Sequence, residues 1–447
     1  MNQLDIVIVG GGIAGCIAAQ TAAELGYRVA IIDLKTKTKI GDKICGEAVG
    51  KHHFDNTGIP PPKGDEVANV ITSIDVFSPD RKTVCSIIEK DVAGYVINRL
   101  AFGQRLLAGA LDKGVELFDQ TLALEPVFQQ GFTVGIKVKH LLSQQSSEIR
   151  GTVIIDASGA GGILRGQMAR DWHIENNIEN EDMEACYREI RKISSPIDEP
   201  EHLQIFFNQQ IAPGGYFWVF PKGTNLVNVG LGVQMTKGFP NPTTQLHQHV
   251  FSQPFFKDSQ KISGGTALIP TRRSINLVGN GVLFVGDSAC QTNPAHGGGM
   301  GPAMISGKLA AETACKAIEM GDVSQQNLWP YNIDYMKRLG VRYAGLDVFR
   351  IFLQKCPDAD MNYGMANRMI KADYIFSRAV LDDDVELNKE LWSKDLATRS
   401  LLRMLVQTSR NMKKIRERYT EFPQCEGYAE WVRTVDEIII EMKAMTP

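Results

Sequence analysis

The stretch LDIVIVGGGIAGCIAAQTAAELGYRVAIID, residues 4–33, decides the fold of the first part of this chain. Its apolar residues 4–9 predict a buried strand, which runs into a glycine-rich turn and then into an alanine-rich helix that ends at Gly26. A second apolar strand follows and closes on Asp33. Strand, turn, helix, strand and terminal acid form a complete βαβ unit, which predicts that the chain binds a dinucleotide. The motif does not by itself distinguish NAD from FAD.

Each glycine of the turn Gly10-x-Gly12-x-x-Gly15 has its own expected task. Gly10 permits the tight turn, Gly12 lets the backbone approach a pyrophosphate, and Gly15 lets the helix sit close to the strand. The helix N-terminus offers backbone N–H groups and the positive end of its dipole to the phosphates. Asp33 would accept hydrogen bonds from ribose hydroxyl groups. A plain glycine turn is the alternative, but it does not explain the order of all the elements.

Composition narrows the class of protein. The 447 residues exceed what one hydrophobic core usually holds, so two or three structural regions are expected. With 43% hydrophobic and 22% charged residues, the chain has the composition of a globular protein. Its formal charge is −3, and this lack of a basic excess argues against nucleic acid as a partner.

The sequence also predicts where the chain works. The longest apolar runs are far shorter than the roughly 18–20 residues that a membrane-spanning helix needs. Residues 1–5 lack the basic stretch and apolar run of a signal peptide, so we expect a cytoplasmic location, with contact at a membrane surface left open. None of the 8 cysteines forms a Cys-x-x-Cys pair, so we expect neither a metal site nor a disulfide framework.

The strand-and-glycine pattern returns at residues 152–159 and 281–288, whereas short alternating segments over 166–276 predict an antiparallel sheet. Helical spacing appears in 335–354 and 401–418. The expected fold class is α/β, with a Rossmann-type cofactor domain in discontinuous segments, an inserted antiparallel-sheet substrate domain and a helical C-terminal region. The expected boundaries are 1–68, 95–165 and 277–328 for the cofactor domain, 69–94 and 166–276 for the substrate domain, and 329–447 for the helical region.

Several motifs then resemble a known family. The order of 10–15, Asp33, Arg99, 156–159 and 286–288 resembles the FAD-binding fold of aromatic hydroxylases of the para-hydroxybenzoate type. Within that fold, three segments are similar to the geranylgeranyl reductase family, namely GDKICGEAV (41–49), PGGYFWVFPKG (213–223) and NPxxGGG (293–299). The resemblance covers residues 4–440 and is strongest to the archaeal enzymes that saturate prenyl chains of ether lipids.

This resemblance implies FAD as the cofactor and a set of residues that bind it. The set is Gly10, Gly12, Ala14, Gly15, Asp33, Cys45, Gly46, Ala48, Arg99, Ala123, Asp287, Gly298, Gly299 and Met300. By resemblance, Ala14 and Asp33 would hold the ADP half, Ala123 would lie at the adenine end, and Arg99 would contact the phosphate or ribose region. Cys45, Gly46 and Ala48 would line the flavin side, and Asp287 would bind the ribityl–pyrophosphate linkage. Gly299 and Met300 would present backbone N–H groups to the flavin pyrimidine edge.

The alternation of Tyr216, Trp218 and Phe220 predicts that all three point to one face of a strand. They would form either an aromatic wall for a long apolar substrate or part of a domain core. The resemblance puts Cys45 beside the flavin, where it would shape substrate approach or assist proton delivery, unless it is an inert thiol. His296 is a second candidate proton donor, or a loop histidine without a chemical role.

The function implied is an FAD-dependent reductase that saturates carbon–carbon double bonds of geranylgeranyl chains, in isoprenoid ether lipids or geranylgeranyl diphosphate. A hydride from reduced FAD N5 and a proton would complete each reduction. The alternative on the same fold is an FAD-dependent monooxygenase or halogenase, and a third is a non-catalytic lipid-binding flavoprotein. The external electron donor, a ferredoxin, a deazaflavin or NAD(P)H, stays open. A lipid substrate would place the enzyme peripherally at a membrane surface.

Overall fold

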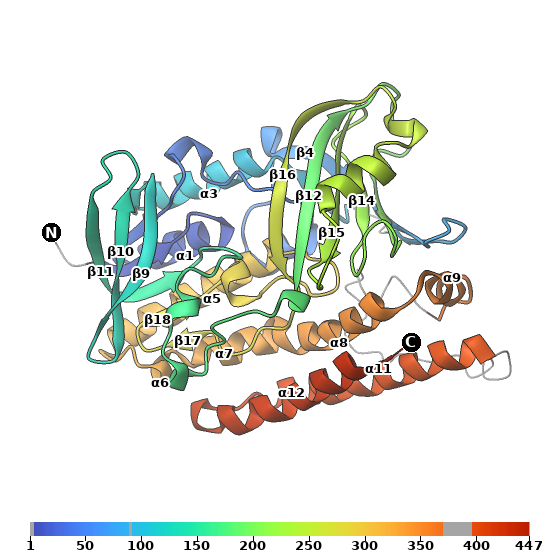
Figure 1. Cartoon of the computed structure of the whole chain (residues 1–447). Helices are drawn as coiled ribbons and strands as arrows, with labels where there is room; N and C mark the ends of the chain where they lie inside the picture. Colours follow the sequence, from blue (N-terminus) through green and yellow to red (C-terminus); the bar gives the residue numbers. More distant parts are fainter. Residues whose placement is uncertain (1–3, 89–91, 370–395, 447) are drawn as a thin grey trace.

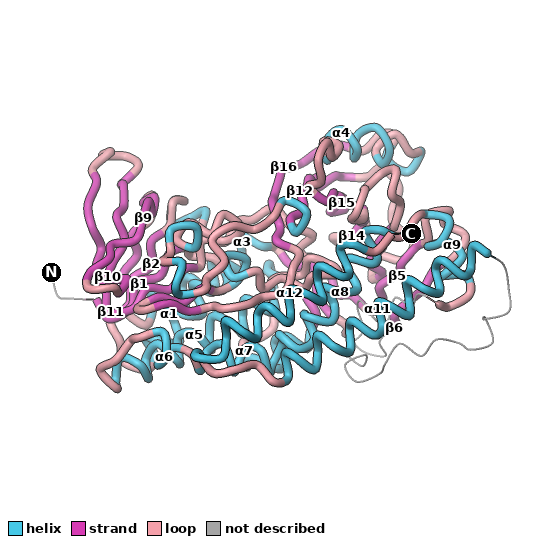
Figure 2. Tube along the Cα trace, turned by 60° about the horizontal axis from the view of Figure 1, so that its bottom comes forward, coloured by secondary structure: helices cyan, strands magenta, loops and turns pink. Residues whose placement is uncertain are grey.

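The computed structural model describes residues 4–88, 92–369 and 396–446, which form a mixed α/β structure built around three sheets (Figure 1). Two large sheets lie at opposite ends of the molecule, and long C-terminal helices run along the side that connects them (Figure 1, Figure 2). The three N-terminal residues, residues 89–91 and 370–395, and Pro447 lie outside the described part of the chain.

The first sheet is the predicted nucleotide-binding unit. Its main path runs β17 (Val278–Gly279), β18 (Val282–Phe284), β11 (Ser146–Asp156), β1 (Leu4–Val9), β2 (Val29–Ile32) and β8 (Glu116–Phe118), and β10 (Phe132–His140) and β9 (Thr121–Gln129) extend it from β11. β18, β11, β1, β2 and β8 pair in parallel. The three strand-and-glycine segments predicted from sequence therefore lie side by side, with their carboxyl ends at one edge.

Helices α1 (Ile13–Glu24), α3 (Arg99–Asp112) and α5 (Met300–Glu319) pack together beside this sheet. Ile6, Val7 and Ile8 are fully buried, which explains why β1 is apolar on both of its faces. The helix α1 begins directly after Gly12 and ends before Gly26, where a backbone φ of +90° favours glycine.

The second sheet has seven strands. Their order is β16 (Gln260–Pro270), β12 (Met183–Lys192), β15 (Leu226–Gln234), β14 (Phe217–Pro221), β13 (His202–Phe206), β5 (Ser73–Phe77) and β6 (Val84–Ile88). The prediction of a purely antiparallel sheet is wrong in one pairing, because β13 and β5 run in parallel. These two strands are far apart in the sequence, so no hairpin turn dictates their direction.

One face of this sheet covers a second hydrophobic core. That core contains Phe217, Val219, Val229 and Leu231, together with Leu246 from the turn that follows α4 (Pro242–Gln245). Residues of even number on β12, β14 and β15 consequently point to the opposite face, where the candidate site described below is found.

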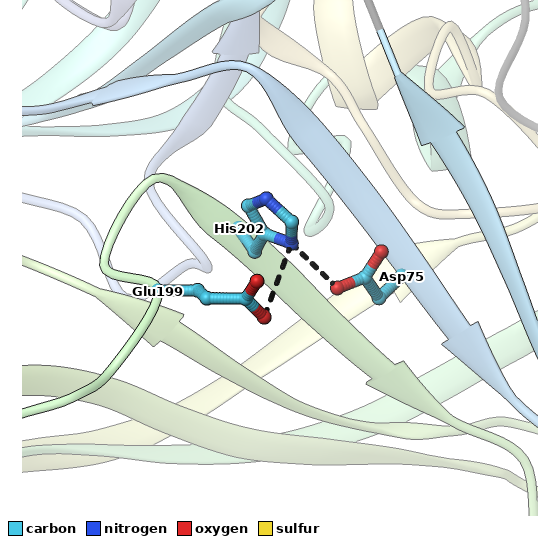
Figure 3. A group of neighbouring side chains, drawn as sticks. All are labelled: Asp75, Glu199 and His202. Carbon is cyan, nitrogen blue, oxygen red and sulfur yellow. Dashed lines mark hydrogen bonds and ion pairs between the residues drawn. The ribbon is translucent and has the colours of Figure 1, made fainter.

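Three side chains meet at the parallel junction of β5 and β13. His202 Nδ1 lies 2.8 Å from a carboxylate oxygen of Asp75 and 3.7 Å from one of Glu199, so the imidazole sits between the two acids (Figure 3). Ligand atoms of these residues lie within 4.8 Å of one another, a cluster that the sequence did not predict. The attraction between the imidazole and the two carboxylates accounts for the close approach of these side chains. The pair of His202 with Asp75 also holds β5 beside β13.

A third, three-stranded sheet joins β3 (Ala48–Gly50), β7 (Gly94–Ile97) and β4 (Val67–Ile71), with α2 (Lys51–Thr57) following β3. β4 crosses the boundary expected at residues 68 and 69. This small sheet carries the chain from the first sheet to the second and back, and its strand β3 continues the loop that contains Cys45.

The C-terminal region is helical where it is described. Its helices are α6 (Gln325–Leu328), α7 (Pro330–Tyr335), α8 (Val341–Lys355), α9 (Asp358–Ala366), α11 (Leu396–Thr420) and α12 (Tyr428–Ala444), and α8, α11 and α12 lie side by side (Figure 1). The single helix predicted over 335–354 is instead interrupted by a π-helical turn at Met336–Gly340. Within the described residues, no helix is both long and apolar enough to cross a membrane.

Candidate active site: two adjoining cavities

A groove of about 620 Å³ opens where the carboxyl ends of the parallel strands meet. Val9, Asp33, Ala157 and Val285 line it from the ends of β1, β2, β11 and β18. In doubly wound sheets, this edge is where ligands bind, because helix N-termini and loops converge on it. The groove is therefore the place at which the predicted dinucleotide would lie.

The three motif glycines have the geometry that their expected tasks require. Gly10 adopts a φ of +105°, which a side chain would strain. No heavy atom lies within 4 Å of the position that a Cβ on Gly12 would occupy, so the turn is open toward the groove. A Cβ on Gly15 would overlap the carbonyl oxygen of Gly10, which confirms that α1 packs tightly against the turn. Gly15 itself does not line the groove.

Asp33 is held in place by the turn it faces. One carboxylate oxygen accepts a hydrogen bond of 2.7 Å from the Gly11 N–H, and the other accepts one of 2.8 Å from the Lys35 N–H. The carboxylate also lines the groove. An oriented acceptor at the end of the second strand suits the hydroxyl groups of a ribose.

Arg99 supplies a positive charge to the same groove. It is the first residue of α3, and the Asn98 side chain caps this helix by accepting a hydrogen bond from the Ala101 N–H. Arg99 is only 5% exposed, and its Nε and Nη1 have no hydrogen-bond partner among the described residues. A buried guanidinium with unsatisfied donors is costly unless an anion meets it, so this group fits a diphosphate-containing cofactor.

Asp287 lies in the turn Gly286–Ala289 that follows β18, and it also lines the groove. Lys43, from the loop that contains Cys45, forms an ion pair of 2.5 Å with one Asp287 oxygen. No role for Lys43 was predicted from sequence. The pair links the Cys45 loop to the first sheet across the mouth of the groove.

A second cavity, of about 240 Å³, adjoins the groove. The two share a common wall made by Ile44, Cys45, Ala267, Ile269, Gly297, Gly299 and Met300. Met300 starts α5, so the N-terminus of that helix faces this wall. A ligand in the groove and a ligand in the second cavity would consequently meet at Cys45 and Gly299.

The floor of the second cavity is the inner face of the seven-stranded sheet. Glu184, Cys186 and Arg188 alternate along β12 and all point into the cavity. Two of them face glycines across β15, since Cys186 pairs with Gly232 and Arg188 pairs with Gly230, whereas Glu184 pairs with Gln234. A Cβ on Gly230 would overlap the Trp218 ring, so the glycine makes room for the indole.

Tyr216, Trp218 and Phe220 form the predicted aromatic wall, and all three line this cavity. Tyr216 precedes β14 by one residue, and neighbouring rings in the series have centroids 6.1 Å apart. The Tyr216 hydroxyl donates to the His296 carbonyl oxygen at 2.7 Å, and Trp218 Nε1 donates to the Asn228 side chain at 3.0 Å. Because their polar atoms are satisfied, the rings present apolar faces to the cavity.

Glu47 anchors the Cys45 loop beneath the aromatic wall. It is buried at a backbone φ of +65°, an uncommon conformation for a side-chain-bearing residue. Its carboxylate pairs with the Lys222 ammonium and lies 3.5 Å from the Arg188 guanidinium. Asn228 adds a hydrogen bond of 3.3 Å to the same carboxylate. Several buried donors therefore compensate the cost of burying this charge.

The cavity is also lined by three basic residues, His53, His296 and Arg342. Burial, reinforced by the Arg342 charge, lowers the pKa of His296 to about 4. Burial together with the neighbouring histidines also lowers the pKa of His53 well below its ordinary value. This low pKa favours the neutral imidazole of His296 near pH 7. The role of proton donor stays a prediction.

The predicted cofactor residues divide between the two cavities. Gly10, Gly12, Ala14, Asp33, Cys45, Arg99, Ala123, Asp287, Gly299 and Met300 line the groove. Gly46, Ala48 and Gly298 do not reach it and line the second cavity instead, because the chain turns away from the groove after Cys45 and the Gly298 backbone lies on the far side of the common wall. Cys45 lines both.

Some cavity residues were missed from sequence. Arg188 lines the cavity, whereas the neighbouring Tyr187 points to the other face of the sheet. Glu184, which lines the cavity, and Asn228, which holds the Cys45 loop, were not predicted either. The alternation of Glu184, Cys186 and Arg188 indicates that these residues share one face of a strand, but it does not indicate whether that face meets a ligand.

Comparison with known proteins identifies the family. The profile of the geranylgeranyl reductase catalytic domain matches residues 182–268, and that of FAD-dependent oxidoreductases matches residues 5–188. The chain is 36% identical to a digeranylgeranylglycerophospholipid reductase of Sulfolobus acidocaldarius, with 98% of each chain covered. This chain belongs to the geranylgeranyl reductase family. A relative of the same name in Methanosarcina mazei is 33% identical, over 72% of this chain and 78% of its own length.

Solved structures confirm the fold of this reductase. A geranylgeranyl bacteriochlorophyll reductase-like protein of Thermoplasma acidophilum superimposes with a TM-score of 0.74 and 24% identity, covering 98% of this chain and 99% of the other. A flavin-dependent brominase superimposes with a TM-score of 0.65 and 17% identity, covering 92% of this chain and 100% of its own. The reductase has the FAD-dependent oxidoreductase fold, and FAD is its cofactor.

Proposed function

We propose that this reductase saturates the carbon–carbon double bonds of geranylgeranyl chains carried by an isoprenoid ether lipid or by geranylgeranyl diphosphate. The observation that carries the proposal is the common wall, where a cavity lined by aromatic rings meets the cofactor groove at Cys45 and Gly299. The Sulfolobus and Methanosarcina relatives, named for reduction of a digeranylgeranyl glycerophospholipid, support the same substrate class.

The residues of the groove fit FAD as its occupant. The open turn at Gly12 and the unpaired donors of Arg99 would hold the diphosphate, and Asp33 would bind the adenosine ribose. Asp287 would bind the ribityl linkage, while the backbone N–H groups of Gly299 and Met300 would meet the flavin ring. Bound and reduced, FAD supplies the hydride that an unactivated alkene accepts.

The chain's own contribution is to position the alkene and to keep water away. An isolated double bond has no carbonyl group to polarise, so the rate depends on how closely it is held. Trp218 and Phe220 give a flat apolar surface that fixes a prenyl chain without directional bonds. Cys45 lines both cavities, so it would shape how the alkene approaches the groove.

The proposal also includes the division of the chain into domains, its contact with a membrane and its electron donor. In this proposal the cofactor domain comprises 1–68, 95–165 and 277–328, the substrate domain 69–94 and 166–276, and the helical region 329–447. The boundaries at 68 and 94 fall inside strands β4 and β7, so the third sheet belongs to both domains. A lipid substrate implies peripheral contact with a membrane surface. An external donor, a ferredoxin, a deazaflavin or NAD(P)H, supplies the electrons, since the sequence contains one glycine-rich βαβ unit and FAD occupies it.

The test is anaerobic mass spectrometry of a geranylgeranyl glycerol ether phospholipid after incubation with the dithionite-reduced holoenzyme. We expect products heavier by two hydrogens per step, and free FAD with dithionite is the control. An unchanged lipid beside reduced enzyme would contradict the proposal. Oxygen consumption that depends on the lipid would instead favour a monooxygenase or halogenase.

A further inference from the structure

Glu184 is a carboxyl group that the function described above leaves unused. It lies on β12 and points into the second cavity, beside Gly232 of the neighbouring strand. A Cβ on Gly232 would come within 2.7 Å of its Oε2, and one on Gly215 within 3.6 Å. The two glycines thus leave a recess in the sheet, in which the carboxyl group sits next to Tyr216.

The carboxyl group also lies close to the common wall of the two cavities. On the other side of β12, Glu184 pairs with Ile269 of β16, a residue that lines both the groove and the second cavity. Glu184 is therefore one strand away from the place where a bound alkene and the cofactor would meet.

Unlike the other cavity carboxylate, Glu184 is free of partners. The Glu47 carboxylate pairs with Lys222 and Arg188, whereas the carboxyl group of Glu184 makes no hydrogen bond and no ion pair with any residue that the structure describes. The nearest influential cation is Arg350 of α8, and its guanidinium already binds Asp182 and Asp347.

These surroundings favour the neutral form of the acid. Burial, only partly opposed by the Arg350 charge, raises the pKa of Glu184 to about 7. The other titratable groups that face it are Cys186 on its own strand and Tyr216 beside β14, and burial raises the pKa of both. A substantial fraction of Glu184 therefore carries a transferable proton near pH 7, where burial favours neutral His296 and Glu47 is paired.

We propose that the Glu184 carboxyl group donates the proton that completes saturation of the bound alkene. In this step its O–H bond breaks and a C–H bond forms at the alkene carbon that does not receive the hydride. The hydride supplies both electrons, so the product gains two hydrogens, and the carboxylate regains a proton from water before the next double bond is reduced. This inference rests on the proposed function.

The test compares Glu184→Gln and Glu184→Asp with the wild-type holoenzyme in single turnovers of the dithionite-reduced protein. General acid catalysis typically contributes about 10²–10⁴-fold, so we expect a loss of that size in Glu184→Gln and partial recovery in Glu184→Asp. The wild-type rate should fall as the pH rises through about 7, whereas the residual Glu184→Gln rate should lack this step. An unchanged rate and pH profile in Glu184→Gln would overturn the proposal.

A second measurement does not depend on turnover. Infrared difference spectroscopy of the holoenzyme should show a protonated carboxyl band that disappears as the pH is raised through about 7 and that is absent from Glu184→Gln. The flavin absorbance of each variant reports its folding. Wild-type enzyme that reduces no lipid would contradict the function itself, whereas a band that persists in Glu184→Gln would contradict the assignment of Glu184 alone.

Discussion

The Asn228 side chain donates a hydrogen bond of 2.9 Å to the carbonyl oxygen of Cys45. The same side chain accepts from Trp218 Nε1 and contacts Glu47, and it is fully buried. One amide on β15 thus connects the aromatic wall of the substrate cavity with the loop that separates this cavity from the cofactor groove.

Replacing this amide should loosen the Cys45 loop. Asn228→Ala leaves buried donors and acceptors unsatisfied, so we expect the free energy of unfolding to fall by about 1–3 kcal/mol. Cys45 should also react faster with a thiol reagent, because its loop has lost a tether. Asn367→Ala, at an exposed helix end, is the matched control. Unchanged reactivity of Cys45 would contradict the tethering role.

Arg99→Met should weaken binding of FAD and leave the fold intact. Hydrogen bonds to charged groups contribute about 1.5–3 kcal/mol, which corresponds to a 10- to 100-fold increase in the Kd for FAD. Arg105 lies on the same helix but pairs with Glu66 and does not line the groove, so Arg105→Met should leave the Kd unchanged. Titration of each apoprotein with FAD, followed by flavin fluorescence, measures the Kd of both variants. An equal increase in Kd for Arg99→Met and Arg105→Met would contradict the placement of FAD in the groove.

Two glycines of the motif should respond differently to the same substitution. Gly12→Ala places a methyl group in open space at the groove, so the protein should fold and bind FAD more weakly. Gly15→Ala forces a methyl group into the Gly10 carbonyl oxygen, so folded protein should not accumulate. Thermal unfolding of the apoprotein and flavin binding distinguish the two outcomes. Normal stability of Gly15→Ala would mean that the helix can move away from the turn.

The pair between Arg350 and Asp182, at 2.9 Å, should hold the C-terminal helices to the second sheet. Both side chains are buried, and Arg350→Leu removes the shortest ion pair of Asp182 and leaves only the longer pairs with Lys443 and Arg272. The free energy of unfolding should therefore fall by up to about 3–5 kcal/mol. Lys414→Leu, in an exposed pair with Glu441, should cost far less. Chemical denaturation measures the free energy of unfolding of both variants. Similar losses in Arg350→Leu and Lys414→Leu would mean that burial does not strengthen the ion pair.

The same pair predicts a loss of stability in acid. Burial alone would raise the pKa of Asp182, but the charges of Arg350, Arg272 and Lys443 outweigh it and lower the pKa below 3.8. A carboxylate whose pKa falls on folding contributes stability above its unfolded value, and that contribution is lost as the pH falls through the folded value. Wild type should therefore lose stability below about pH 4, and Asp182→Asn should show a smaller loss over that range.

Much of the cofactor groove could be predicted because its residues act locally. A positive φ at Gly10, an open Cβ position at Gly12 and an acid at the end of the second strand are properties of one short segment. The aromatic wall was equally predictable, because side chains at 216, 218 and 220 alternate whatever the strand pairs with. Arg99 required the resemblance, since an arginine in isolation has no sequence signal that separates a ligand from a surface ion pair.

The sequence by itself determined the βαβ unit, its glycine turn and the alternating aromatic residues, since each depends on backbone geometry within a few residues. Tertiary structure decided which strands meet: β5 beside β13, and β12 across from the glycines of β15. These pairings join segments that are far apart in the sequence by burying whole strand faces, which local propensity does not encode. They also place Glu184 in the recess beside Gly232, where desolvation raises the pKa of its carboxyl group to about 7.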